Sequence, residues 1–234
     1  MSAAAGPDII ESGLVLCLDA GNRASYSGTG TTWNNLTNRS LNTTIDTGTP
    51  FDNVYRGRIN FQGTSGSTSD GKIAIFPKWT ELNLSTSFTI SVWFSFTRLS
   101  PAYYDFLFSC ESYLNRGFRS GLESGTNKIA FFSVQSGGSF FHVTNYAATL
   151  NTIFNYTITF NVNTGITYIN GAFDKQTTGT FVSPNASDSF LYNYVGGGYK
   201  SDSYVSAIHV YNRALTAPEI LQNYNATKGR FRLT

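Results

Sequence analysis

Hydrophobic and polar residues alternate along Phe88–Phe96, whose sequence is Phe-Thr-Ile-Ser-Val-Trp-Phe-Ser-Phe. A period of two residues predicts a β-strand over Phe88–Thr97, because successive side chains of a strand point to opposite faces of its sheet. The apolar side chains at even positions are therefore expected in the core. Trp93 falls on the opposite face, which predicts either a second packed layer over the sheet or an exposed patch.

Shorter apolar runs recur along the rest of the chain, separated by Gly, Asn, Ser and Thr residues, and predict further strands. These runs are Leu14–Leu18, Arg58–Phe61, Lys72–Phe76, Asp105–Cys110, Phe118–Leu122, Lys128–Ser133, Phe140–Val143, Tyr156–Asn161, Gly165–Ile169, Phe190–Val195 and Tyr204–Tyr211. Two hairpin turns are predicted, one at Asn161–Gly165 with Gly165 supplying a positive φ, and one at the pair Asn170-Gly171. Many strands and little helix indicate an all-β, antiparallel sandwich or barrel.

One short helix is predicted near the C-terminus. Thr216 and Glu219 have the spacing of a capping box, and Pro218 falls in the first helical turn. The apolar residues that follow at the spacing of a buried helix face are Ile220, Leu221 and Tyr224. Gly229 lies where such a helix would end.

The composition agrees with this fold class, since 19 Phe, 14 Tyr and 22 Gly occur among 234 residues and only 13% of the residues are charged. No linker or composition break divides the chain. We predict one β-sandwich domain over residues 13–234, preceded by an N-terminal arm of residues 1–12. Cys17 and Cys110 lie in apolar, strand-like segments and are expected to be buried free thiols.

The formal net charge of +2 is too small for a nucleic-acid-binding surface. Arg56 and Arg58 are scattered, and the trio Lys228, Arg230 and Arg232 is interpreted as a solvated tail. No apolar run approaches the ~18 residues of a membrane span, so no membrane insertion is expected. The first residues lack the basic and apolar regions of a secretory signal, so we expect synthesis in the cytoplasm without secretion.

No constellation of catalytic residues is recognised, and we expect no enzymatic activity. A glycosidase needs two carboxylates across the scissile bond, and Glu111 and Glu123 lack that pattern and are interpreted as rim residues of turns. His142 and His209, the only histidines, lack the spacing of a zinc site. The Gly- and Ser-containing turns also miss the spacing of a nucleophile elbow or a phosphate loop.

Several segments together resemble laminin-G-like domains of the concanavalin A-like lectin and glucanase superfamily. They are Gly13–Asn22, Ser25–Leu36, Phe88–Phe94, Gly165–Gly171, Tyr211–Thr216 and Asn223–Phe231. The resemblance implies a jelly-roll sandwich of two antiparallel sheets with one short C-terminal helix. It also implies that glycans or proteins bind at loops on one rim or on the concave face, in some members through calcium.

One departure from the family pattern concerns calcium. Where the family often has Phe-Asp-Gly, this chain has Phe61-Gln62-Gly63, so that a neutral amide replaces a carboxylate. Calcium requires several hard oxygen ligands, and Asp70, the nearest carboxylate, is eight residues further on. We therefore expect no calcium and no other cofactor.

The two ends of the resemblance are similar to a subset of these domains found in virion proteins of tailed bacteriophages, including phages of marine bacteria. This similarity implies a non-enzymatic virion structural protein that decorates the capsid or a fibre through its arm or one sheet face. Capsid or fibre proteins would then be its partners, and homo-oligomers would be expected. The alternative is a lectin-like adhesion module that binds cell-surface glycans.

Aromatic residues in or beside loops are the candidates for sugar binding, because sugars stack on exposed aromatic rings while polar side chains bind their hydroxyls. These candidates are Trp79, Tyr103, Tyr104, Asp105, Tyr192, Tyr194 and Tyr199. The alternatives for each are packing in the core or a protein-facing patch.

Overall fold

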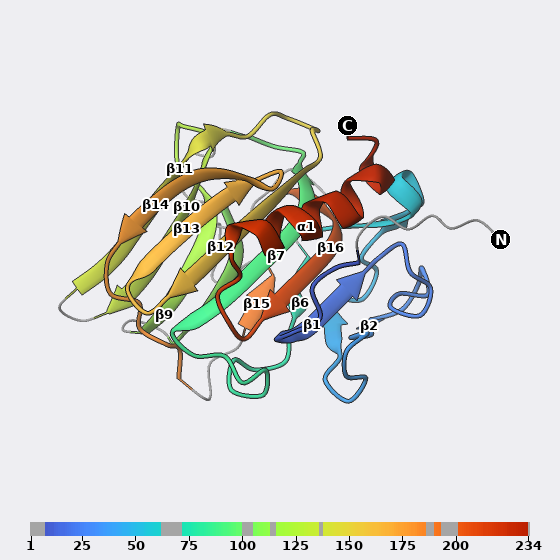
Figure 1. Ribbon diagram of the computed structural model, residues 1–234. Helices are drawn as coiled ribbons and strands as arrows, with labels where there is room; N and C mark the ends of the chain where they lie inside the picture. The colour runs from blue at the N-terminus through green and yellow to red at the C-terminus, as the bar shows by residue number, and fades with distance from the viewer. Residues whose placement is uncertain are drawn as a thin grey trace.

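The alternating segment forms β7 (Ser87–Phe96), a central strand of the first of two antiparallel sheets in the computed structural model (Figure 1). The structure describes residues 8–61, 72–99, 105–112, 116–135, 138–185, 190–192 and 201–233. The first sheet has the order β14 (Ala172–Thr178), β13 (Thr164–Ile169), β12 (Phe154–Asn161), β7, β16 (Ser203–Tyr211), β5 (Arg58–Asn60) and β4 (Phe51–Asp52), and β1 (Leu14–Asp19) also pairs with β16.

The second sheet packs face to face against the first. Its order is β11 (Gly138–Ala147), β10 (Lys128–Gln135), β9 (Arg116–Leu122), β8 (Asp105–Ser112), β15 (Phe190–Tyr192), β6 (Ala74–Ile75), β3 (Thr43–Ile45) and β2 (Thr32–Trp33). The predicted jelly-roll sandwich is therefore confirmed. Strands β2, β3, β4 and β14 were not predicted. The first three have only two or three residues, which is too short to show an alternation, and β14 is mostly polar.

The core lies between the two sheets and is rich in aromatic rings. Phe88, Ile90, Val92, Phe94 and Phe96 of β7 are all buried in it, as the alternation predicts. Both cysteines belong to described segments, are buried, and form no disulfide, which is also as predicted.

The other face of β7 is covered by a second packed layer, which decides between the two alternatives for Trp93. Helix α1 (Ala217–Thr227) and the 3₁₀ helix η2 (Lys228–Phe231) cross this face (Figure 1). The Trp93 ring stacks on Phe231 and Tyr224, with centroid distances of 4.1 Å and 5.6 Å. Its indole Nε1 donates a hydrogen bond to Thr227 Oγ1 at 3.0 Å. The indole is therefore satisfied as well as buried.

The start of α1 is the predicted capping box, in which the backbone N–H of Thr216 donates to Glu219 Oε2 at 2.8 Å. Arg213 strengthens this cap by binding both carboxylate oxygens of Glu219, at 3.0 Å and 2.6 Å. The Arg213 hydrogen bonds lower the pKa of Glu219 to about 2. The predicted stop at Gly229 is wrong, because α1 gives way at Thr227 to η2, which includes Gly229. The left-handed residue that ends this run is Arg232, with φ 59°.

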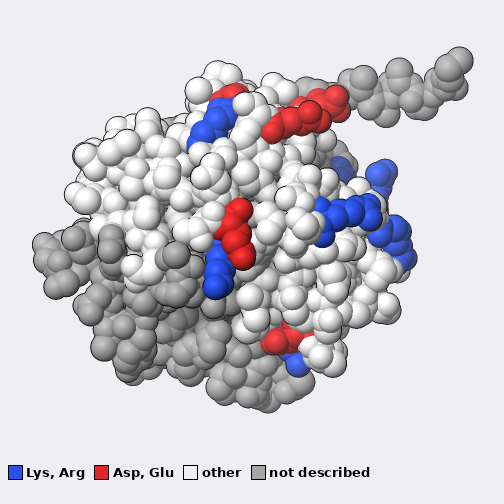
Figure 2. All heavy atoms as spheres, turned by 90° about the horizontal axis from the view of Figure 1, so that it is seen from below, with Lys and Arg blue, Asp and Glu red and all other residues white. Residues whose placement is uncertain are grey.

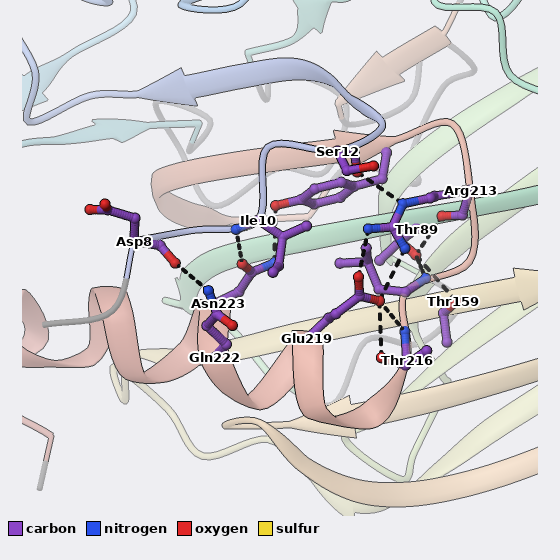
Figure 3. Close-up of polar contacts among 12 residues, drawn as sticks. Asp8, Ile10, Ser12, Thr89, Thr159, Arg213, Thr216, Glu219, Gln222 and Asn223 are labelled. Carbon is purple, nitrogen blue, oxygen red and sulfur yellow. Dashed lines mark hydrogen bonds and ion pairs between the residues drawn. The ribbon is translucent and has the colours of Figure 1, made fainter.

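Residues 8–12, part of the predicted arm, lie along α1 (Figure 3). Ile10 N–H donates to Asn223 Oδ1 at 2.7 Å, and Gln222 Nε2 donates to the carbonyl of Asp8 at 2.8 Å. Arg213 Nε donates to the carbonyl of Ser12 at 2.9 Å. This segment is therefore anchored on the domain.

The hairpin predictions were half right. Asn170 and Gly171 both have positive φ, as the Asn-Gly pair predicts. In the turn between β12 and β13, however, Val162 carries the positive φ of 55°, and Gly165 lies inside β13 opposite Phe160. The turn is shorter than predicted, so that Gly165 belongs to the strand.

His142 links the two sheets at the edge where β11 meets β14 and β13. Its Nδ1 lies 2.8 Å from Thr177 Oγ1, and its Nε2 lies 2.9 Å from Thr167 Oγ1. Burial lowers the pKa of His142 to about 4. The Lys175 charge adds to this shift, and the Asp174 charge opposes it. The neutral imidazole is thus the form that the fold stabilises.

We expect the free energy of unfolding to decrease as the pH falls from about 6.5 towards 4, because the unfolded chain then binds protons that the buried imidazole does not. For His142 alone the full effect is on the order of 3 kcal/mol, since the pKa falls from 6.5 to about 4. Denaturant unfolding between pH 4 and pH 7 measures this slope. The His142→Gln variant should have a shallower slope, with the remainder due in part to His209, which is also buried and has a pKa lowered to about 4. An unchanged slope in that variant would contradict the assignment.

Candidate functional site

The residues predicted to bind sugars do not form an exposed platform where the structure describes them. Trp79 is buried, and its ring packs edge-on against Phe88 and Phe118 at 5.0 Å and 5.2 Å between centroids. Tyr192 is also buried, with its hydroxyl 2.7 Å from Ser203 Oγ. Sugar stacking requires an open ring face, so the core alternative holds for both residues. Tyr103, Tyr104, Tyr194 and Tyr199 lie outside the described residues.

Asp105, the remaining candidate, has a structural partner. Its buried carboxylate accepts a hydrogen bond from Arg98 Nη2 at 2.7 Å, and Arg98 Nε lies 2.9 Å from Asp202 Oδ2. Burial raises the pKa of Asp105 to about 6 even though Arg98 opposes the shift. This ion-pair network joins the C-terminal end of β7 to the starts of β8 and β16. It does not present the Asp105 carboxylate to solvent.

Glu123 lies in a turn, as predicted, and its Oε2 accepts a hydrogen bond from Thr126 Oγ1 at 2.7 Å. Glu111 instead belongs to β8, paired with Gly117 of β9, so its assignment to a turn was wrong. Gln62 and Asp70 are outside the described residues. Among the residues that are described, no three His, Cys, Asp or Glu side chains gather to hold a metal ion.

A cleft lies between η1 (Val54–Arg56) and η2, at the end of the first sheet where β4 and β5 pair. Its volume is about 600 Å³. The lining residues are Asn53, Val54, Tyr55, Arg56, Gly229, Arg230 and Arg232. An adjoining hollow of about 320 Å³ shares Arg56, Gly229 and Arg230 with the cleft and extends to Trp93 and His209.

Arg230 fastens the two walls of the cleft together. Its Nε donates to the carbonyl of Tyr55 at 2.6 Å, its Nη2 donates to the carbonyl of Gly57 at 2.8 Å, and its Nη1 pairs with the Asp19 carboxylate. All three partners lie about 170 or more positions away in the sequence. Only 14% of the Arg230 side chain is exposed, so the prediction of a solvated tail is wrong for this residue.

The close approach of these segments requires glycine at Gly57. A Cβ atom there would lie 2.4 Å from the carbonyl oxygen of Ala20, and the φ of 151° is itself unfavourable for any residue with a side chain. The turn that carries Tyr55 and Arg56 is therefore packed directly on the end of β1.

Three residues that line the cleft have a left-handed backbone. Tyr55 has φ 53°, Arg56 has φ 68°, and Arg232 has φ 59°. Each such conformation costs about 1–2 kcal/mol for a residue other than glycine. Strain of this kind is often found at functional sites, where the surrounding contacts hold it in place.

The groups that the cleft exposes are suited to bind hydroxylated ligands. Asn53, Arg56 and Arg232 are exposed, and the half-buried Tyr55 ring packs edge-on against Phe231 at 5.7 Å. Within the described part of the chain, neither Arg56 nor Arg232 pairs with a carboxylate. Only 13% of the residues in the chain are charged, and Figure 2 shows a face on which most of the described surface is uncharged.

Sequence reasoning missed this site because its two halves are distant in the chain. Arg56 was interpreted as a scattered charge and Arg232 as part of a solvated basic tail, and no periodicity connects the two. The local sequence shows only arginines next to turn-forming residues such as Gly57 and Gly229, and this is common in loops that have no function.

The family assignment rests on residues 65–221, which match a laminin G-type model described as the concanavalin A-like lectin/glucanases superfamily. The match covers more than half of the chain. The chain belongs to this superfamily. Among curated proteins, none matches this chain in sequence.

Solved structures of other proteins share this fold. The binding domain of Paraclostridial Mosquitocidal Protein 1 has a TM-score of 0.71 and 17% identity, over 92% of this chain and 52% of that chain. The binding domain of Botulinum Neurotoxin DC, in complex with SialylT, has a TM-score of 0.71 and 14% identity, over 92% and 52%. The chain thus spans about half the length of these toxin binding domains.

A match over the full length of its counterpart is found with Domain 4 of AbnA, a GH43 extracellular arabinanase from Geobacillus stearothermophilus, in complex with arabinotriose. The TM-score is 0.66 at 14% identity, over 92% of this chain and 100% of that domain. At such identities the likeness establishes the concanavalin A-like fold. No helix in the described segments has the length and apolarity to cross a membrane.

We expect Arg230→Ala to lower the free energy of unfolding by about 2–3 kcal/mol, because it leaves two carbonyl groups and the Asp19 carboxylate without their partner. Arg232→Ala, two residues away, should change it by less than about 0.5 kcal/mol, because that exposed side chain has no partner to lose. Denaturant unfolding of the three proteins tests the difference. Equal losses in both variants would contradict the role assigned to Arg230.

Proposed function

We propose that this chain is a non-catalytic, lectin-like module that binds glycans in the cleft between η1 and η2. The observation that carries the proposal is the composition of the cleft, in which an amide, a phenol ring and unpaired guanidinium groups surround one open hollow. Lectin sites combine an aromatic surface with a few polar groups in this way. Arg230 holds the two walls in place, so that the site is formed before the ligand arrives.

The comparisons support this proposal. The structure of the arabinanase domain contains arabinotriose, and that of the neurotoxin binding domain contains SialylT. These ligands belong to those proteins, and they illustrate the use of this fold for glycan binding. The absence of catalysis is part of the proposal, and it is supported by the cleft lining, which has no carboxylate among the described residues. A calcium-independent mode of binding is proposed on the same ground.

Screening on a glycan array tests the proposal, followed by titration calorimetry with each glycan that is retained. Asn53→Ala should weaken binding about 10-fold or more, because it removes hydrogen bonds to sugar hydroxyls. Phe173→Ala is the matched control, since this exposed residue lies on β14, at the far end of the first sheet from β4. Retention of no glycan, or equal losses in the two variants, would refute the proposed site.

A second candidate function is attachment to a phage particle, with capsid or fibre proteins as partners and with homo-oligomers. It is favoured by the resemblance of Gly13–Leu36 and Tyr211–Phe231 to virion proteins, and by the anchoring of residues 8–12 on α1. The two functions are compatible in one particle-bound lectin.

For this candidate, deletion of residues 1–7 should abolish association with purified phage particles while the melting temperature stays unchanged. The deletion ends at Pro7 because residues 8–12 are bonded to α1, and their removal would disturb the domain as well. Immunoblotting of particles purified by density gradient gives the measurement. Full association of the shortened protein would rule out attachment through the arm.

A further inference from the structure

We propose that the cleft between η1 and η2 selects glycans whose sugar units carry a carboxylate, such as uronic acids, and that Arg56 and Arg232 bind this group. The inference rests on the proposed glycan-binding function and specifies its ligand class. It depends on three features of the cleft: its charge, the division of tasks among its arginines, and the backbone conformation of two of them.

The first feature is charge. Arg56, Arg230 and Arg232 all line the cleft, and no carboxylate lines it among the described residues. The whole chain has a formal net charge of only +2. Arg230 is balanced by its ion pair with Asp19, so Arg56 and Arg232 leave two uncompensated positive charges around one hollow of about 600 Å³, and these favour an anion.

The second feature is that the three arginines have different tasks. Arg230 is occupied by Asp19 and by the carbonyl groups of Tyr55 and Gly57, so it is not available to a ligand. Arg56 and Arg232 are exposed, and their side chains form no hydrogen bond or ion pair within the described residues. They stand on opposite walls, one on η1 and the other at the end of η2.

The third feature is backbone conformation. Both Arg56 and Arg232 occupy left-handed positions, where glycine would be more favourable and asparagine would be tolerated. Arg232 ends η2 at the kind of position that is most often glycine in other proteins. Neither arginine side chain has a partner among the described residues that would account for an arginine at a left-handed position. Binding of a ligand would account for both.

The guanidinium geometry indicates which anion. Its planar fork of N–H donors matches the two oxygens of a carboxylate and forms short, charge-assisted hydrogen bonds. The neighbouring Asn53 amide and Tyr55 hydroxyl are suited to the hydroxyl groups of the same sugar. The site therefore combines a charged contact with neutral contacts, as an acidic sugar requires.

Calorimetry with trigalacturonate and with its methyl ester tests the proposal, since the two ligands differ in charge and little else. We expect the acid to bind at least 10-fold more tightly than the ester, and sialyllactose likewise more tightly than lactose. Dextran sulfate and a poly-glutamate peptide are included as anions of other kinds. We expect both to bind more weakly than trigalacturonate at 150 mM salt.

The variants Arg56→Gly and Arg232→Gly separate binding from stability. Each should weaken trigalacturonate binding about 10-fold or more, while the melting temperature stays equal or rises, because glycine relieves the left-handed strain. Asn83→Gly is the matched control. It also replaces an exposed left-handed residue, with φ 50°, but Asn83 does not line the cleft, and binding should be unchanged.

The outcomes distinguish this inference from the proposed function. If ester and acid bind equally and the arginine variants have no effect, the carboxylate proposal is wrong while glycan binding stands. If sulfate or peptide binds as tightly as the uronate with the same arginine dependence, the site selects anions in general and the assignment to acidic sugars is overturned. If no glycan binds at millimolar concentration, both proposals fail.

Discussion

Phe231 stacks on Trp93 at 4.1 Å between ring centroids, and this contact holds η2 against the outer face of β7. Because η2 is fixed there, the preceding residue, Arg230, lies within hydrogen-bond distance of the carbonyl groups of Tyr55 and Gly57 and of the Asp19 carboxylate. The η1 turn contains Tyr55 and Arg56, which line the cleft. The architecture of the cleft therefore depends on one aromatic stack on the face of the sheet that is turned away from the main core.

Local patterns predicted the fold because each depends on neighbours in sequence. The alternation in β7 indicated its core face, and the spacing of Thr216 and Glu219 indicated the start of α1. The same pattern did not decide whether Trp93 is covered by a second layer or exposed, because alternation shows only on which face of the sheet a residue lies. Which layer covers that face is decided by a segment more than 120 positions further on, and no local rule contains this information.

The candidate site was predicted poorly for the same physical reason. Trp79 and Tyr192 were chosen as aromatic residues near loops, yet both fill the space between the sheets, where rings of this size are needed. Arg230 was interpreted as solvated, yet it donates hydrogen bonds to two carbonyl groups of the η1 turn and pairs with the Asp19 carboxylate. Burial and pairing of a long polar side chain depend on tertiary structure, so composition and spacing do not show them.

The cleft also has a consequence for the order in which the protein is assembled. One wall comes from residues 53–56 and the other from residues 229–232, so the loop closed between them spans most of the chain. During synthesis, the strands of the sandwich are complete once β16 has emerged, but the cleft is not. The cleft is thus completed only when residues 228–232 have folded back onto the sheet, after the strands that support it have formed.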